Sequence, residues 1–201
     1  MSDRSNVVPL YSPLGSLARA HRLPAGFQQW SPTAQLKALL DLPRPDLTIR
    51  ALRPDELHRM IKGIGVEDAS DLMAYATPEQ QVAYVDLEAW NGGDFIPARF
   101  DQVLEMTRSI SQDHATRWLQ RVDPELLALH LLKSCTISLA RDVEENEVPD
   151  TSFVSPDGWF LIAAKEPERL REARSLLDLL YAAGLDFAHR VLLGALYDTP
   201  A

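Results

Sequence analysis

The chain has 201 residues, a net charge of −9 with neutral histidines, and 46% apolar and 24% charged residues, which is the composition of an ordinary globular protein. Its single cysteine excludes an internal disulfide and a cysteine-based metal cluster, and no apolar run is long enough to cross a membrane. Because 19 of the 29 acidic residues lie within residues 51–150, we expect no nucleic-acid partner. Since neither a targeting segment nor a membrane-length apolar run is visible, we expect no membrane insertion and a cytoplasmic location.

Residues 1–30 are interrupted by proline and show little apolar periodicity, so we interpret them as an N-terminal arm. From Ser31 onward, proline repeatedly precedes apolar residues at helical spacing. This pattern predicts helix starts, because proline has no backbone N–H to leave unpaired at the first helical position. Thr77 and Gln80 add the pattern of a capping box. The helix starts predicted in this way lie at Pro32, Pro45, Pro54, Pro78, Pro97, Pro124 and Pro167.

Four of these prolines are evenly spaced. Pro32, Pro54, Pro78 and Pro124 stand 22, 24 and 46 residues apart, and 46 is twice 23. A period of this length is typical of a stacked helical repeat, in which each unit buries its apolar face against its neighbours. We therefore predict a helical-repeat domain over residues 31–143.

The most apolar part of the chain is Leu126–Ala140, which carries His130 and Lys133 and therefore predicts a buried helix and not a membrane span. We expect this helix to begin at Asp123-Pro124 and to end near Arg141. This helix would then form the C-terminal end of the repeat domain.

Residues 144–165 are predicted to form an acidic linker and a β-hairpin around the turn Ser155-Pro156-Asp157-Gly158. Residues 166–201 are predicted to form a helical pair, interrupted at Gly184, that packs on the repeat body. The expected fold class is therefore mainly α: a superhelical stack of short helices with one small β-hairpin and a C-terminal helix pair.

Two resemblances support this architecture. The stretch Leu39 to Gln81 resembles the short-helix repeats of the cytosolic amino-terminal domain of the MgtE magnesium transporter, and is similar to helical domains of the flagellar motor switch protein FliG, through the cadence Leu-Pro-x-x-Asp, a Leu-rich turn and Pro-Glu. The whole of 31–197 resembles more closely an uncharacterised bacterial family of unknown function, in the Trp90–Asp94 turn and the Asp123–Leu127 and Leu176–Tyr181 helices. The resemblances imply a superhelical fold and do not imply transport.

The histidines are dispersed, and no two stand four residues apart as a helical zinc pair requires. His114, beside Asp113 near a helix start, is the strongest acid–base candidate. Three histidines flank apolar stripes and are expected to face water: His58, His114 and His189. His130 lies on the most apolar helix and is expected to be a hydrogen-bonded core residue.

Two further motifs are interpreted as structural. Gly63-Ile64-Gly65 has no preceding strand and lacks the third glycine of a dinucleotide loop, so it predicts a helix end. Cys135 stands among leucines, where a thiol is normally inert. We therefore predict no catalytic set and no cofactor.

The acidic linker is the candidate metal site. Asp142, Glu144, Glu145 and Glu147 offer the oxygen ligands that hard cations such as Mg²⁺ prefer, although a solvated linker is the simpler interpretation. Trp159 stands beside the hairpin turn, is expected to be exposed, and is the candidate partner-binding residue.

Three functions remain open. We favour a non-enzymatic protein-interaction or scaffold module, because helical stacks expose grooves that bind peptides or helices, and an acidic surface suits a protein partner or self-association. The resemblance to the transporter repeats implies a Mg²⁺-responsive regulatory domain instead. The third alternative is an uncharacterised hydrolase-type enzyme that uses His114 and Asp113.

Overall fold

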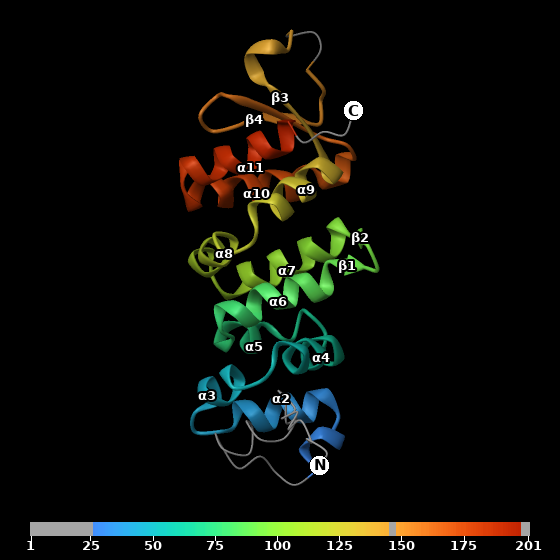
Figure 1. Ribbon diagram of the computed structural model, residues 1–201, viewed down its shortest axis with the longest axis vertical. Helices are drawn as coiled ribbons and strands as arrows, with labels where there is room; N and C mark the ends of the chain where they lie inside the picture. Colours follow the sequence, from blue (N-terminus) through green and yellow to red (C-terminus); the bar gives the residue numbers. More distant parts are fainter. Residues whose placement is uncertain (1–25, 145–147, 198–201) are drawn as a thin grey trace, which may run out of the picture.

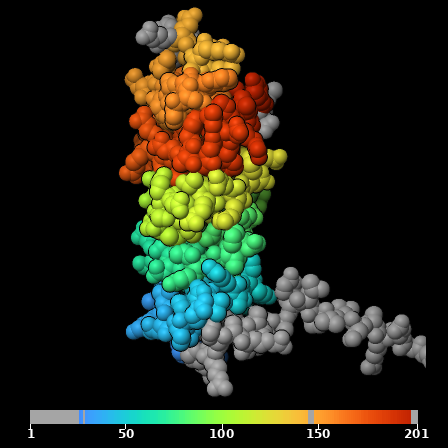
Figure 2. Space-filling view, turned by 90° about the vertical axis from the view of Figure 1, so that its left-hand side faces the viewer, coloured from blue at the N-terminus to red at the C-terminus, as the bar shows by residue number. Residues whose placement is uncertain are grey.

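The computed structural model describes residues 26–144 and 148–197. Most of the predicted arm, and Glu145 and Glu147 of the predicted metal site, lie outside the described residues. The chain forms an elongated stack that rises in one direction, from the first helices at one end to a small sheet at the other (Figure 1). Consecutive segments follow one another along the long axis (Figure 2).

Helices make up most of the described chain, so the expectation of a mainly α fold is confirmed. The first half contains η1 (Phe27–Gln29), α2 (Pro32–Leu40), α3 (Pro45–Arg50), α4 (Pro54–Ile64), α5 (Ser70–Tyr75), α6 (Pro78–Glu88) and α7 (Pro97–Ile110). The second half contains α8 (Gln112–Leu119), α9 (Pro124–Ser134), η2 (Ala140–Asp142), η4 (Pro167–Arg169), α10 (Leu170–Ala183) and α11 (Leu185–Tyr197).

The predicted helix starts are confirmed where proline takes the first helical position, which it does in α2, α3, α4, α6, α7 and α9. The Ser31 hydroxyl accepts a hydrogen bond from the Ala34 N–H (3.3 Å). At α6, the Thr77 hydroxyl accepts from the Gln80 N–H (3.2 Å) and the Gln80 side chain accepts from the Thr77 N–H (2.7 Å). Local capping chemistry therefore fixes these helix starts.

The long helix expected to end near Arg141 is wrong. α9 ends at Ser134, and the next residues form strand β3 (Cys135–Leu139). Strand β3 pairs antiparallel with β5 (Phe160–Ala164), in a register that places Ile137 opposite Ile162. β-branched residues such as Thr136 and Ile137 suit a strand, and the pairing with β5 satisfies their backbone groups.

The predicted hairpin is confirmed as β4 (Ser152–Val154) and β5, but it belongs to a three-stranded sheet with the order β3-β5-β4. Gly158 takes a positive φ of 80° in its turn, and the Gly158 N–H donates to the Ser155 carbonyl (2.9 Å). A second, two-residue hairpin joins β1 (Trp90–Asn91) and β2 (Asp94–Phe95). The expectation of one hairpin therefore underestimated the β structure.

The stack is built by contacts between elements close in the sequence. Helix α2 packs on α4, α4 on α6, α5 on α7 and α7 on α8, while α9 packs on α11. The core is continuous through these layers and includes Leu39, Phe100, Trp118 and Leu192, all buried. Each helix thus buries one face against its neighbours, as in other stacked helical proteins. The period of about 23 residues stays a prediction, because stacking alone does not test it.

One glycine permits a close approach between two helices. Gly63 lies within α4, and a Cβ atom added there would stand 2.5 Å from Cγ of Pro32 in α2. Gly65 then ends α4 with a φ of 105°. The expected helix end is therefore confirmed at Gly65, while Gly63 is required by packing.

Candidate functional site

The predicted acid–base pair is not assembled. The Asp113 side chain is 82% exposed and forms an ion pair with Arg117 (3.1 Å). His114 is half-buried, and its Nε2 atom lies 3.4 Å from Nε2 of Gln81. Burial lowers the pKa of His114, with help from the nearby charge of Arg117, so the neutral ring is favoured. This arrangement ties α8 to α6 and keeps Asp113 in solvent, so His114 and Asp113 do not act on each other as a pair.

Three other histidines each pair with a carboxylate that lies about thirty residues away in the sequence and on another element. The pairs are His58–Glu88 (2.8 Å), His130–Asp101 (3.2 Å) and His189–Asp157 (2.5 Å). The expectation for the core residue His130 is confirmed. The expectation that His58 and His189 face water is wrong, because both rings are largely covered. These pairs join neighbouring layers of the stack, so we interpret them as contacts that stabilise the fold.

The turn between β4 and β5 holds a carboxylate, Asp157, with several hydrogen-bond partners. Asp157 accepts hydrogen bonds from the Ser155 hydroxyl (2.6 Å) and the Trp159 N–H (3.2 Å), besides its contact with His189. Burial on its own would raise the pKa of Asp157, but the hydrogen bonds from Ser155 and His189 lower it well below its ordinary value. These hydrogen bonds to Asp157 therefore favour the charged form of its carboxylate.

Trp159 is exposed, as expected. Its side chain leaves 61% of the residue surface in solvent, and its ring lies over that of His189 with 5.6 Å between centroids. A role of Trp159 in partner binding stays a prediction.

The described part of the acidic linker contains Asp142 and Glu144, both exposed. Asp142 forms an ion pair with Arg141 (3.5 Å). Within residues 26–144 and 148–197, no group of three or more histidine, cysteine, aspartate or glutamate side chains is placed to hold a metal ion. The metal site proposed for the linker stays a prediction, since Glu145 and Glu147 lie outside the described residues.

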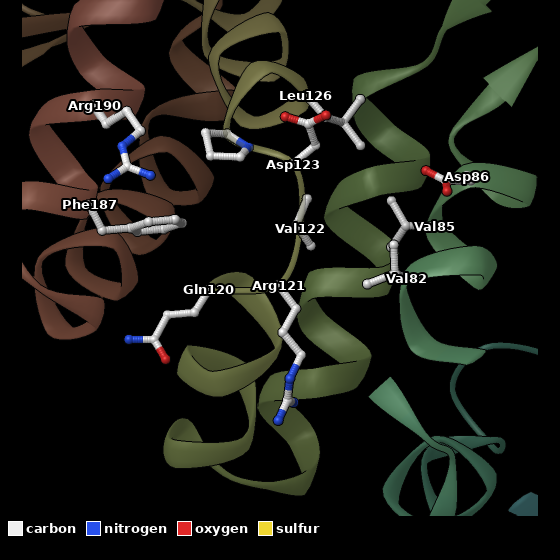
Figure 3. A pocket seen from close by; sticks show the side chains of 11 residues that line it. Val82, Val85, Asp86, Gln120, Arg121, Val122, Asp123, Leu126, Phe187 and Arg190 are labelled. Atoms are coloured by element: carbon white, nitrogen blue, oxygen red, sulfur yellow. The ribbon is translucent and has the colours of Figure 1, made fainter. Parts of the chain in front are cut away.

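A cleft of about 490 Å³ opens where the upper and lower parts of the stack meet (Figure 3). Helix α6 forms one wall, α11 forms the other, and the connection from α8 to α9 lies between them. Polar and apolar groups contribute about equally to its lining, and Val85 and Val122 are almost fully buried. The lining residues are Val82, Val85, Asp86, Gln120, Arg121, Val122, Asp123, Pro124, Leu126, Phe187 and Arg190.

The charged groups of this cleft are of both signs. Burial raises the pKa of Asp86, and the nearby charge of Asp123 raises it further, so the two carboxylates repel each other. Arg190 stands beside the cleft on α11, whereas the side chain of Arg121 points away from Arg190 and Asp123 (Figure 3). The charge of Arg121 lies near Glu79 and His114 instead. Arg190 forms no ion pair with any residue in the described ranges, so Asp86, Asp123 and Arg190 stand around the cleft without neutralising one another through direct contact.

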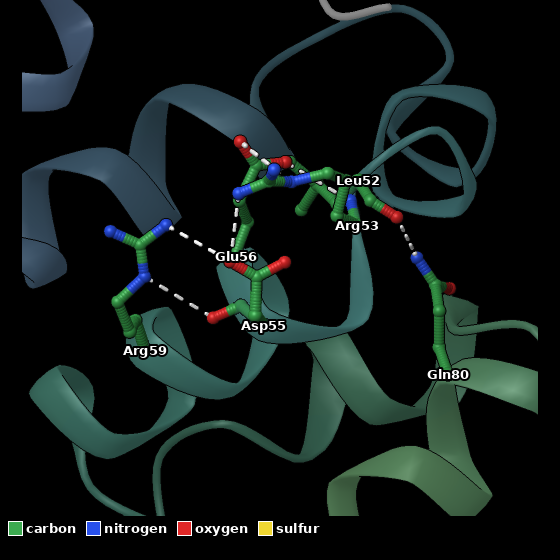
Figure 4. A network of polar contacts seen from close by, with 6 residues as sticks. All are labelled: Leu52, Arg53, Asp55, Glu56, Arg59 and Gln80. Carbon is green, nitrogen blue, oxygen red and sulfur yellow. Dashed lines mark hydrogen bonds and ion pairs between the residues drawn. The ribbon is translucent and has the colours of Figure 1, made fainter. Parts of the chain in front are cut away.

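A second hollow, of about 510 Å³, lies on the other flank of α6 and is lined by Arg53, Pro54, Asp55, Ala83, Asp86 and Leu87. Its rim is held by a polar network (Figure 4). Arg53 pairs with Asp55 (2.8 Å), and the Gln80 amide donates to the Leu52 carbonyl (2.7 Å). Arg53 and Asp55 are thus already paired here, while Asp86, which also lines the first cleft, forms no ion pair among the described residues.

A known protein family covers most of the chain. The model of the family described as "Family of unknown function (DUF6178)" matches residues 13–201. The chain belongs to the DUF6178 family. The expectation of an uncharacterised family of unknown function is therefore confirmed, whereas the resemblance to the MgtE and FliG domains stays a prediction. No curated protein and no solved structure matches the chain.

In the described part of this DUF6178 chain, no helix is both long enough and apolar enough to span a bilayer. Sequence reasoning missed the cleft because its walls come from residues 82–86, 120–126 and 187–190, which only folding brings together. One signal was available in α6. Apolar residues occur on all of its faces, and Leu87 remains 47% exposed while Gln80 and Gln81 are buried. A helix with apolar residues outside its core face indicates an unpartnered surface.

Proposed function

We propose that this DUF6178 chain is a protein-interaction module that binds a segment of a partner protein in the cleft between α6 and α11. The observation that carries this proposal is Arg190, which stands beside the cleft between α6 and α11 without an ion pair among the described residues. An unpaired guanidinium group beside apolar side chains suits a recognition site, where arginine supplies directed hydrogen bonds.

The chemistry of the cleft lining supports binding over catalysis. Apart from the carboxylates of Asp86 and Asp123, its residues include no group that commonly acts as a base or nucleophile: no histidine, cysteine, serine, threonine, lysine or tyrosine lines it. His58, His130 and His189 are instead committed to carboxylates on neighbouring layers. An interaction surface is therefore the simpler use of this cleft.

The walls of the cleft are fixed before any partner arrives. The Gln80 amide donates to the carbonyls of Ile49 (2.9 Å) and Leu52 (2.7 Å), which holds α6 to the end of α3. The Gln120 amide donates to the Ala183 carbonyl (2.8 Å), which holds the α8–α9 connection to the end of α10. A site with rigid walls loses less conformational entropy on binding, which favours useful affinity from a modest contact area.

The test is partner capture by the full-length chain with a matched pair of charge reversals. Arg190→Glu changes the cleft, whereas Arg171→Glu makes the same charge change on α10, where the side chain is 91% exposed. We expect a partner recovered in stoichiometric amount by the wild-type chain and by Arg171→Glu, and lost with Arg190→Glu. Equal recovery by both variants, or no stoichiometric partner at all, would overturn the proposal.

A photoreactive amino acid at Val82 then locates the contact. We expect it to cross-link to the partner, or to a second copy of the chain if the module self-associates, while the same probe at exposed Leu47 in α3 does not. Cross-linking from Leu47 alone would place the interaction elsewhere on the molecule.

A further inference from the structure

Resting on the proposed function, we infer that the bound segment is a peptide that crosses α6, with an acidic and a basic side chain in the cleft and an apolar side chain on the far flank of the helix. The inference starts from the position of Asp86. This residue lines both the cleft and the second hollow, so the two depressions meet at one point on α6.

Helix α6 forms a ridge between the two depressions. Val82 and Val85 face the cleft, while Ala83 and Leu87 face the second hollow, and Asp86 stands between them. With about 100° between successive residues, these positions span about half of the helix circumference, with Val85 at its buried edge. A molecule that filled only the cleft would leave Leu87 exposed. A segment of chain that continues across the ridge covers both flanks.

The charges in the cleft define the first part of the peptide. The carboxylates of Asp86 and Asp123 both line the cleft. Burial raises the pKa of Asp86, and the nearby negative charge of Asp123 raises it further. A cationic side chain between the two carboxylates relieves their repulsion. Arg190 lies apart from them in the cleft (Figure 3) and suits a carboxylate. A peptide with neighbouring acidic and basic side chains satisfies both Arg190 and the two carboxylates.

The second hollow defines the other part. Apart from Asp86, its charged groups are already engaged, because Arg53 pairs with Asp55 and also lies 3.7 Å from Glu56 (Figure 4). What it offers a partner is the apolar surface of Pro54, Ala83 and Leu87. An apolar side chain of the peptide gains most here, since it removes the exposed surface of Leu87 from water.

The experiment selects peptides from a display library of random linear sequences against the full-length wild-type chain. Selected peptides are measured by fluorescence anisotropy on four variants: Asp86→Asn, Arg190→Gln, Leu87→Ser and the control Arg171→Gln. We expect enriched peptides to combine an acidic, a basic and an apolar side chain. Each of the first three variants should weaken binding about tenfold, as expected for one lost charged or apolar contact, and the control should leave it unchanged.

Peptide substitutions assign each contact. Replacing the basic side chain of the peptide by alanine should remove its sensitivity to Asp86→Asn, and replacing the acidic one should remove its sensitivity to Arg190→Gln. Peptides that lose binding with Arg190→Gln but ignore Asp86→Asn and Leu87→Ser would leave the proposed function intact and overturn this inference. Selected peptides that bind all variants equally would overturn both. Competition by a free dipeptide at equal affinity would show a small occupant and overturn the inference alone.

Discussion

The Nε2 atom of His189 in α11 lies 2.5 Å from Oδ2 of Asp157, in the turn between β4 and β5. This contact ties the last helix to the sheet, and the Ser155 hydroxyl holds the other carboxylate oxygen. Because burial of Asp157 is outweighed by hydrogen bonds to its charged form, the pKa of the folded state is depressed. The charged carboxylate is therefore a stabilising element of the fold.

The first prediction concerns Asp157→Asn. A depressed folded-state pKa contributes stability that is present above the unfolded value of about 3.9 and is lost as pH falls through the folded pKa. We expect the substitution to cost about 2 kcal/mol at neutral pH, because it weakens charge-assisted hydrogen bonds. It should also flatten the decline of stability in acid, as measured by urea unfolding across that range. An unchanged acid profile would contradict this assignment.

The second prediction concerns His114, whose pKa is lowered by burial and by the nearby arginines. The folded state therefore binds fewer protons than the unfolded state below about pH 6.5, and stability should fall as pH drops from there toward the folded pKa. His114→Gln retains polarity and removes the titration. Urea unfolding at a series of pH values should show a shallower slope for this variant, while His58→Gln serves as a comparison on another layer.

The third prediction concerns Cys135, which is buried in β3, where burial raises the pKa of its thiol to about 11. The thiolate is the reactive species, so at about pH 8 the folded chain should react with a disulfide reagent far more slowly than free glutathione. Reactivity should rise on unfolding in urea. Because the folded pKa is raised, the thiol supports folding fully below about pH 8.5 and loses that contribution as pH rises toward 11. Rapid labelling of the folded chain would show that the strand opens readily.

The fourth prediction concerns Gln80, whose buried amide donates to two backbone carbonyls, those of Ile49 and Leu52. Gln80→Met preserves the length of the side chain but leaves both carbonyls without this donor. We expect a loss of about 2–3 kcal/mol in the free energy of unfolding, because the Leu52 carbonyl loses this donor and the Thr77 N–H loses the side-chain oxygen that accepts from it. Gln102→Met, on the exposed face of α7, is the matched control and should change stability little.

The fifth prediction reverses a general rule. Glycine inside a helix usually costs about 1 kcal/mol relative to alanine. At Gly63 the added Cβ would stand 2.5 Å from the Pro32 ring, which cannot move away easily. We therefore expect Gly63→Ala to destabilise the chain by about 1–3 kcal/mol in thermal or urea unfolding. Gly93→Ala meets no atom within 4 Å and should lack this penalty.

Helix starts were predictable because the interactions that set them are local. Pro32, Pro54 and Pro78 each take the first helical position, and Ser31 and Thr77 cap with their own hydroxyl groups. These effects act within about four residues, so the sequence contains all the information needed. The turn at Gly158 was predictable for the same reason.

Strand β3 could not be predicted in this way. Residues 135–139 continue an apolar run that suits a helix or a strand, and the choice depends on β5, which lies about 25 residues later. Pairing with β5 satisfies the backbone of β3 and directs Cys135 and Ile137 toward the core. Local propensity yields to such long-range pairing because backbone hydrogen bonds must be satisfied on burial.

The sequence by itself determined the helical class and most of the helix boundaries, because both depend largely on neighbours along the chain. It also carries the match to the family, over residues 13–201. Only the tertiary structure decided which charges meet. It committed His58, His130 and His189 to distant carboxylates, and it left Arg121 and Arg190 beside the α6–α11 cleft. The physical reason is that a carboxylate stabilises a cation only over a few ångströms, and those distances are set by how the layers stack.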